Sequence, residues 1–174
     1  MGGCWSSGEP GPGPKPAVSD KPPAATVKPI SVRLVDEKEF RQALERCRGS
    51  AVLVDYWALW CSECMQRFPH TVWLHRQYSD RGLRVVSLSL DDPSDEAQVL
   101  KFLTAKGADF DNFISRYGGS TQTIENFGLG DGALPRIELY DRDGKLFKVF
   151  SAGSFTDQQV EEAVKELLFK QPAG

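Results

Sequence analysis

The sequence predicts an α/β domain in which strands alternate with helices, and three observations lead to this prediction. The apolar run 51–57 is long enough for a buried central strand. The residues after it, 65–78, have the pattern of a helix, and a Cys-x-x-Cys motif joins the two segments. Near the carboxyl end, the runs 136–140 and 146–150 flank Asp-Arg-Asp-Gly, which is typical of a β-hairpin.

Composition limits the organisation of the chain and excludes some classes of function. The 174 residues are 40% hydrophobic, which suits one domain plus a tail. Residues 1–29 are rich in proline and predict a disordered tether, so we place the domain at 30–174. The net charge of −3 comes without a long basic run, and nothing indicates nucleic-acid binding. No apolar stretch approaches the ~20 residues that span a bilayer.

The remaining elements follow from local patterns. Asp36 and Glu39 form a capping box that predicts a helix over 37–48, after a short edge strand at 30–35. This helix presents one apolar face, made of Phe40, Ala43, Leu44 and Cys47. We interpret Cys47 as a small buried apolar residue, with a regulatory thiol as the alternative. Further patterns predict strands at 83–90 and 109–114, helices at 93–106 and 121–127, and a last helix capped by Thr156 and Gln159.

The Cys-x-x-Cys motif lies where the central strand gives way to a helix. The unpaired N–H groups and the positive dipole end of a helix start favour a thiolate at Cys61. A thiolate is the form of cysteine that attacks disulfides. Cys64, one turn further along, is placed to resolve a mixed disulfide formed at Cys61. The pattern therefore indicates redox chemistry.

A family resemblance sharpens this interpretation. The segment Val54-Asp55-Tyr56-Trp57-Ala58-x-Trp60-Cys61-x-x-Cys64, followed by Pro69 and a later Leu134-Pro135, resembles the thioredoxin active-site segment. The nearest likeness is to the TlpA/ResA-like branch, the envelope thiol–disulfide oxidoreductases. The likeness covers residues 30–169 in element order and is close at 52–69 and 133–150. It implies a thioredoxin fold, with a central mixed β-sheet flanked by helices and a TlpA-like helix–strand insertion near the middle.

The resemblance also implies roles for individual residues. It implies a redox-active disulfide between Cys61 and Cys64, with the buried Asp55 relaying a proton to the resolving thiol. A local cap or ion pair is the alternative for Asp55. Burial should raise the pKa of Asp55. Thioredoxins carry a lysine where this chain has Ser87, so Asp55 lacks that cation.

The proline near the carboxyl end has an implied role of its own. In the family, the proline at the place of Pro135 is cis and packs against the cysteine pair. The backbone of Leu134 would then pair with a bound substrate like an added strand. An ordinary trans proline opening an edge strand is the alternative. Trp60 and Leu134 would form the apolar contact surface around Cys61.

The two histidines raise the question of a metal site together with the cysteines. On one helix, Cys64 and His75 are roughly 16 Å apart, because each residue adds about 1.5 Å. Zinc ligands lie within about 2.3 Å of a single ion. We therefore expect no metal site, and we interpret His70 and His75 as surface residues.

The function predicted is the reduction of protein disulfides through Cys61 and Cys64. No cofactor is expected, and an upstream protein would supply the electrons. Glu63, between the cysteines, disfavours the thiolate and tilts the pair toward reducing behaviour. One alternative is a redox-quiet binding or assembly module of the same fold. Another is a thiol peroxidase, although residues 55–60 lack the threonine and proline that peroxiredoxins carry before their cysteine.

The first residues bear on location. Gly-Cys at Cys4, followed by a proline-rich stretch, resembles the start of a mature lipoprotein, and the family resemblance implies a cell-envelope protein with a membrane tether. N-myristoylation at Gly2 and an incidental cysteine are the alternatives. A cytoplasmic location is the alternative to the envelope. We expect a monomer.

Overall fold

The computed structural model describes residues 29–153 and 155–169 of the chain. The predictions for Cys4 and Gly2, and for residues 1–28 of the tether, concern residues outside these ranges. The strands are β1 Val32–Val35, β2 Ala51–Trp57, β3 Leu83–Ser89, β4 Asp111–Ser115, β5 Arg136–Tyr140 and β6 Leu146–Phe150. The helices are α1 Glu37–Glu45, α2 Ser62–Tyr78, α3 Glu96–Lys106, α4 Thr121–Phe127 and α5 Asp157–Phe169, with short 3₁₀ turns η1 Ser79–Arg81 and η2 Pro93–Asp95.

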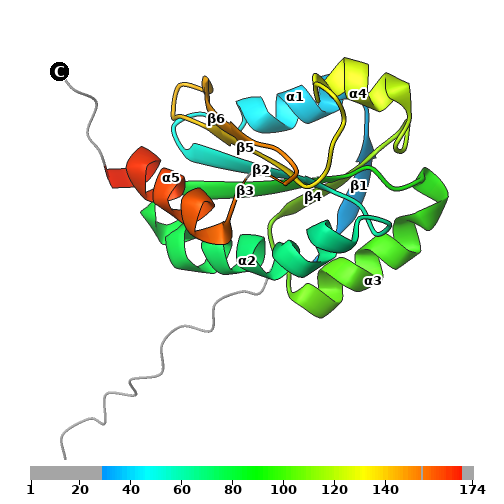
Figure 1. Ribbon diagram of the computed structural model, residues 1–174, viewed down its shortest axis with the longest axis horizontal. Helices are drawn as coiled ribbons and strands as arrows, with labels where there is room; N and C mark the ends of the chain where they lie inside the picture. Colours follow the sequence, from blue (N-terminus) through cyan, green and yellow to red (C-terminus); the bar gives the residue numbers. More distant parts are fainter. Residues whose placement is uncertain (1–28, 154, 170–174) are drawn as a thin grey trace, which may run out of the picture.

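The strands form one mixed sheet in the order β1-β4-β3-β2-β5-β6. The pairs of β1 with β4, β4 with β3 and β3 with β2 are parallel, whereas β2–β5 and β5–β6 are antiparallel. Helices α1 and α4 cover one face of the sheet, and α2, α3 and α5 cover the other (Figure 1). The predicted thioredoxin-like architecture is therefore confirmed, including the α3–β4 insertion.

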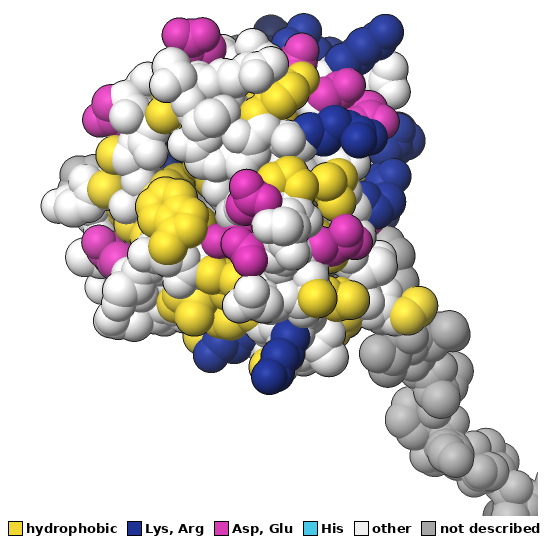
Figure 2. All heavy atoms as spheres, turned by 90° about the vertical axis from the view of Figure 1, so that its right-hand side faces the viewer, with side chains coloured by type: hydrophobic (Ala, Val, Ile, Leu, Met, Phe, Trp, Pro, Cys, Tyr) yellow, Lys and Arg dark blue, Asp and Glu magenta, His cyan; other side chains and the backbone are white. Residues whose placement is uncertain are grey.

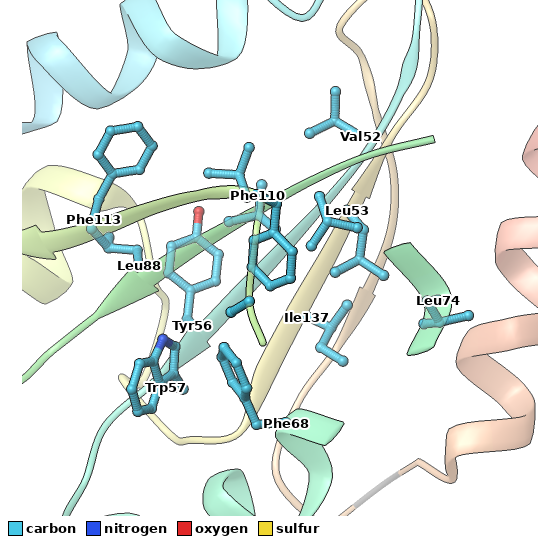
Figure 3. Packing of buried hydrophobic residues seen from close by; sticks show 14 of the residues in the cluster. Val52, Leu53, Tyr56, Trp57, Phe68, Leu74, Leu88, Phe110, Phe113 and Ile137 are labelled. Carbon is cyan, nitrogen blue, oxygen red and sulfur yellow. The ribbon is translucent and has the colours of Figure 1, made fainter. Parts of the chain in front are cut away.

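Strand β2 is the centre of the core because helices cover both of its faces. All seven of its residues are buried. Side chains alternate between the faces of a strand, and Figure 3 shows Tyr56 and Trp57 on opposite sides of the sheet. The indole of Trp57 packs against Phe68 of α2, with ring centroids 4.8 Å apart. This packing fixes α2, and with it the cysteine pair, against the end of β2.

The local signals at the helix ends behave as predicted. Asp36 and Glu39 form the reciprocal capping box of α1, and Thr156 with Gln159 forms the same arrangement before α5. Gly107 ends α3 in the left-handed conformation, with φ of 68°.

Two side chains are less buried than their apolar character predicts. Helix α1 ends at Glu45, so Cys47 lies beyond it, half-buried, and its thiol donates to the carbonyl oxygen of Ala43. Trp73, in the helix predicted over 65–78, is 39% exposed and stacks on His70. Its neighbours Val72 and Leu74 are buried, because a helix turns about 100° per residue and adjacent side chains point in different directions.

Candidate active site

The two motif cysteines are joined by a disulfide bond in this structure. Cys61 is the N-cap of α2 and Cys64 lies in its first turn, with Cα atoms 5.2 Å apart. The backbone N–H of Cys64 donates to the sulfur of Cys61 at 3.2 Å. A helix N-terminus therefore points at Cys61, and this geometry stabilises negative charge on its sulfur after reduction.

The two cysteines differ in how far solvent reaches them. Cys61 is 9% exposed and Cys64 is 2% exposed. The neighbouring Trp60 is 64% exposed, and the backbone of Gly119 lies so close to its ring that an added Cβ would be 3.4 Å from it. An incoming molecule therefore meets Trp60 and Cys61 first. This end of the molecule carries hydrophobic and acidic side chains intermixed over its centre (Figure 2).

The loop that carries Trp60 is held by a buried carboxylate that the sequence interpretation missed. Asp91 is 1% exposed and accepts the backbone N–H of Leu59 at 2.9 and 3.0 Å, one distance to each oxygen. The Ser89 hydroxyl donates to the same carboxylate at 2.7 Å. Asp91 lies two residues before the helix predicted at 93–106, a place that suggested no such role. Its distance of 32 residues from Leu59 left no local signal of this role.

Asp55 lies in β2, on the face covered by α2. It is 5% exposed, and the Thr71 hydroxyl of α2 donates to its Oδ2 at 2.6 Å. Burial raises the pKa of Asp55 to about 6, although the Thr71 hydrogen bond and the charge of Arg67 lower it. The expected rise in pKa is confirmed. Thr71 is a second residue that sequence reasoning missed, because it matches no motif position.

The Leu134–Pro135 peptide bond is cis, as expected from the resemblance. Arg136, the next residue, pairs with Tyr56 in the antiparallel register of β5 on β2. Pro135 therefore lies beside the end of β2, at the edge of the sheet from which the chain leaves for Cys61. Leu134 is partly buried against the core. The structure brings the cysteine pair and this proline to the same edge.

Glu63 does not stand alone between the cysteines. Its carboxylate pairs with Arg67 at 3.2 Å, one turn along α2. Arg67 also bonds Asp157 at 2.6 Å and the carbonyl oxygen of Phe155 at 2.7 Å, and its guanidinium lies over the Phe155 ring. The anionic influence of Glu63 on Cys61 is therefore partly neutralised.

The histidines are not the surface residues that we expected. Each is partly buried beside a carboxylate, with His70 facing Asp157 at 3.9 Å and His75 facing Asp109 at 3.5 Å. Burial lowers the pKa of both imidazoles. No cluster of three or more metal-ligating side chains occurs among residues 29–153 and 155–169, and no helix within those ranges is long and apolar enough to span a membrane.

A cavity of about 320 Å³ lies on the opposite face of the sheet, away from the disulfide. Its lining includes Phe40 and Leu44 of α1, the free Cys47, and Tyr56 and Tyr140 from the sheet. None of the predicted site residues lines it. Burial raises the pKa of the Cys47 thiol, which disfavours a reactive thiolate there.

Comparisons with known proteins agree with this geometry. The chain is similar to the thiol-disulfide oxidoreductase ResA of Bacillus thuringiensis strain Al Hakam, with 27% identity over 71% of this chain and 67% of that protein. ResA of Geobacillus thermodenitrificans is 26% identical over 69% of this chain and 64% of its own length. The chain thus spans about two thirds of these relatives.

Solved structures give the same result. A thiol:disulfide interchange protein DsbE from Chlorobium tepidum superposes with a TM-score of 0.61 at 29% identity, over 72% of this chain and 84% of that one. A thiol-disulfide oxidoreductase from Bacteroides vulgatus gives 0.53 at 28% identity, over 72% and 78%. The resemblance inferred from the motif is confirmed. Because the model of the AhpC/TSA family matches residues 18–149, the chain belongs to the AhpC/TSA family.

Proposed function

We propose that this thiol–disulfide oxidoreductase reduces disulfide bonds in other proteins, with Cys61 as the attacking thiolate and Cys64 as the resolving thiol. The observation that carries the proposal is the disulfide at the start of α2, with Cys61 the more exposed cysteine and the N–H of Cys64 directed at its sulfur. In the reverse reaction, a donor thiolate would reach the Cys61 sulfur by the same approach.

The reaction proceeds through one mixed disulfide. The Cys61 thiolate attacks one sulfur of the substrate disulfide, and the other substrate sulfur leaves as a thiolate. The Cys64 thiol then loses its proton and attacks the Cys61 sulfur, which releases the second substrate sulfur. Two electrons pass to the substrate, and the pair is left as the Cys61–Cys64 disulfide. A protein dithiol must reduce it again before the next cycle.

Asp55 is the group proposed to take the proton from Cys64. It lies in β2 against the helix that carries Cys64, and its pKa of about 6 suits proton exchange near neutral pH. Trp60, Leu134 and cis-Pro135 are the proposed contact surface for the substrate, because they meet at the same edge of the sheet. The backbone at Leu134 would accept an extended segment of substrate as an added strand.

The partners and the location belong to the same proposal. Substrates are proteins with accessible disulfides, and the electron donor is a protein dithiol. We place the protein in the cell envelope, held by a lipid on Cys4. Mass spectrometry of the native amino terminus should find that lipid; an unmodified Cys4 would contradict the anchor.

Insulin reduction tests the function. The full chain should precipitate reduced insulin in the presence of a dithiol donor, and Cys61→Ser should abolish the activity. Cys47→Ser is the matched control, because Cys47 lies on the opposite face and should leave the rate unchanged. Weak insulin reduction together with rapid consumption of hydrogen peroxide would overturn the proposal in favour of a peroxidase.

A further inference from the structure

The partner of the buried Asp55 differs from the cation that the resemblance leads one to expect. Ser87 pairs with Asp55 in the parallel register of β3 on β2, at the place where a lysine was expected. Its hydroxyl donates instead to Asn112 Oδ1 at 2.8 Å, within the sheet. Asp55 therefore receives nothing from that side chain. A buried carboxylate without a donor is costly, so another element must supply one.

Helix α2 supplies it. Thr71 is 1% exposed, and its hydroxyl lies 2.6 Å from Asp55 Oδ2. We propose that Thr71 is a positioning residue, whose hydroxyl replaces a cation as the buried partner of Asp55 and orients the proton acceptor for the resolving thiol. This inference rests on the proposed function, since it assigns a role within the same thiol chemistry.

The spacing of the buried residues of α2 explains why a side chain at position 71 can reach Asp55. Cys64, Phe68 and Thr71 are spaced i, i+4, i+7 and are all buried, so they lie on the helix face that packs on the sheet. One face thus carries both the resolving thiol and the hydroxyl that holds the acid. Thr71 donates to Oδ2 rather than to Oδ1. Proton exchange is assigned to that second oxygen.

A neutral donor has a different consequence from a cation. The groups paired beside Asp55 in the sheet are Ser87 and Ile137, and neither carries a charge. From α2, Arg67 acts on Asp55 only through its charge, without a hydrogen bond to it. The Thr71 hydrogen bond stabilises the carboxylate without adding an opposite charge, so it lowers the pKa of Asp55 less than a contacting lysine would. Asp55 can therefore both take up and release a proton near neutral pH.

The test is the pH dependence of insulin reduction by the full chain and its variants. Thr71→Val keeps the side-chain shape and removes the donor, so the carboxylate loses stabilisation and the pH midpoint of the rate should rise by about one pH unit. Thr71→Ser restores the hydroxyl and should return the midpoint to that of the parent. Thr71→Ala, which removes both the hydroxyl and the methyl group, should follow Thr71→Val and serves if valine impairs folding.

A double variant separates the pair from other effects. In the Asp55→Asn background, Thr71→Val should leave the pH profile unchanged, because position 55 no longer carries a carboxyl for Thr71 to act on. If Thr71→Val and Thr71→Ala left the midpoint in place while Asp55→Asn altered it, the role of Thr71 would be refuted and the Cys61 function would stand. If Cys61→Ser retained the activity, the proposed function itself would fail. A midpoint shift by Thr71→Val that persisted without Asp55 would also overturn the inference.

Discussion

Each face of the central strands buries one carboxylate, and the two carboxylates have different partners. Asp55, on the face covered by α2, has one hydroxyl donor. Glu138, on the face covered by α1, is paired with Arg136 at 2.7 Å and accepts the hydroxyls of Tyr56 and Tyr140 at 3.2 and 2.5 Å. Glu138 is held by a cation and two phenols, so its carboxylate is fixed in position. Asp55 can still gain and lose a proton, which its proposed role in thiol chemistry requires.

The largest effect should come from breaking the Glu138 network. Glu138→Ala leaves the guanidinium of Arg136 without its partner, 12% exposed, and removes the acceptor of both tyrosines. Breaking a buried ion pair from one side costs about 3–5 kcal/mol. Urea denaturation should report a loss of that size in the free energy of unfolding. The variant Glu138→Gln, which keeps the acceptor oxygen, should lose less; equal losses would mean that charge and hydrogen bonding are not what Glu138 supplies.

Removing the Asp55 carboxyl should have the opposite effect on stability from removing that of Glu138. The folded pKa of Asp55, about 6, lies above the ordinary value of 3.8, so folding is favoured while the carboxyl is protonated and this stability is lost as pH rises through 6. At pH 8 the charged form costs about 2–3 kcal/mol. Asp55→Asn should therefore raise the free energy of unfolding at pH 8, with the gain shrinking toward pH 4, while insulin reduction slows.

Thermal unfolding of the parent protein and of Asp55→Asn between pH 4 and pH 8 measures this difference in stability. The gain must depend on pH if it arises from the carboxyl. A constant difference from pH 4 to pH 8 would show that Asp55 is not the titrating group and would remove the contrast with Glu138.

The contrast also marks how far sequence reasoning could go. The fold, the cysteine pair, the cis proline and the raised pKa of Asp55 were predictable, because a motif or a local pattern carries each of them. The hydrogen-bond partners of the two buried carboxylates were not predictable. Tyr56 is 82 residues from Glu138, and Thr71 is an unremarkable helix residue until α2 packs on β2. Contacts between distant segments depend on the register of the sheet and on helix rotation, and neither leaves a local signal.

The smallest effect should arise at the edge of the Asp55 face, where Arg67 neutralises Glu63. Arg67→Gln removes the cation, so the negative charge of Glu63 acts on the Cys61 thiolate without compensation. The reduced form is then less stable, and the reduction potential should become more negative. Glu63 is 48% exposed on its side chain, so solvent screens the pair and the effect is limited to about 5–20 mV.

Glu63→Gln is the matched control, because it removes the anion and leaves the cation. The potential should then move the other way, toward less negative values, and equilibration with glutathione measures both shifts. In the Glu63→Gln background, the effect of Arg67→Gln should change, because the two charges act through one ion pair. Strictly additive shifts would mean that Arg67 acts on the thiolate alone. The parent potential itself should lie nearer to about −270 mV than to about −120 mV, because Glu63 remains only partly neutralised.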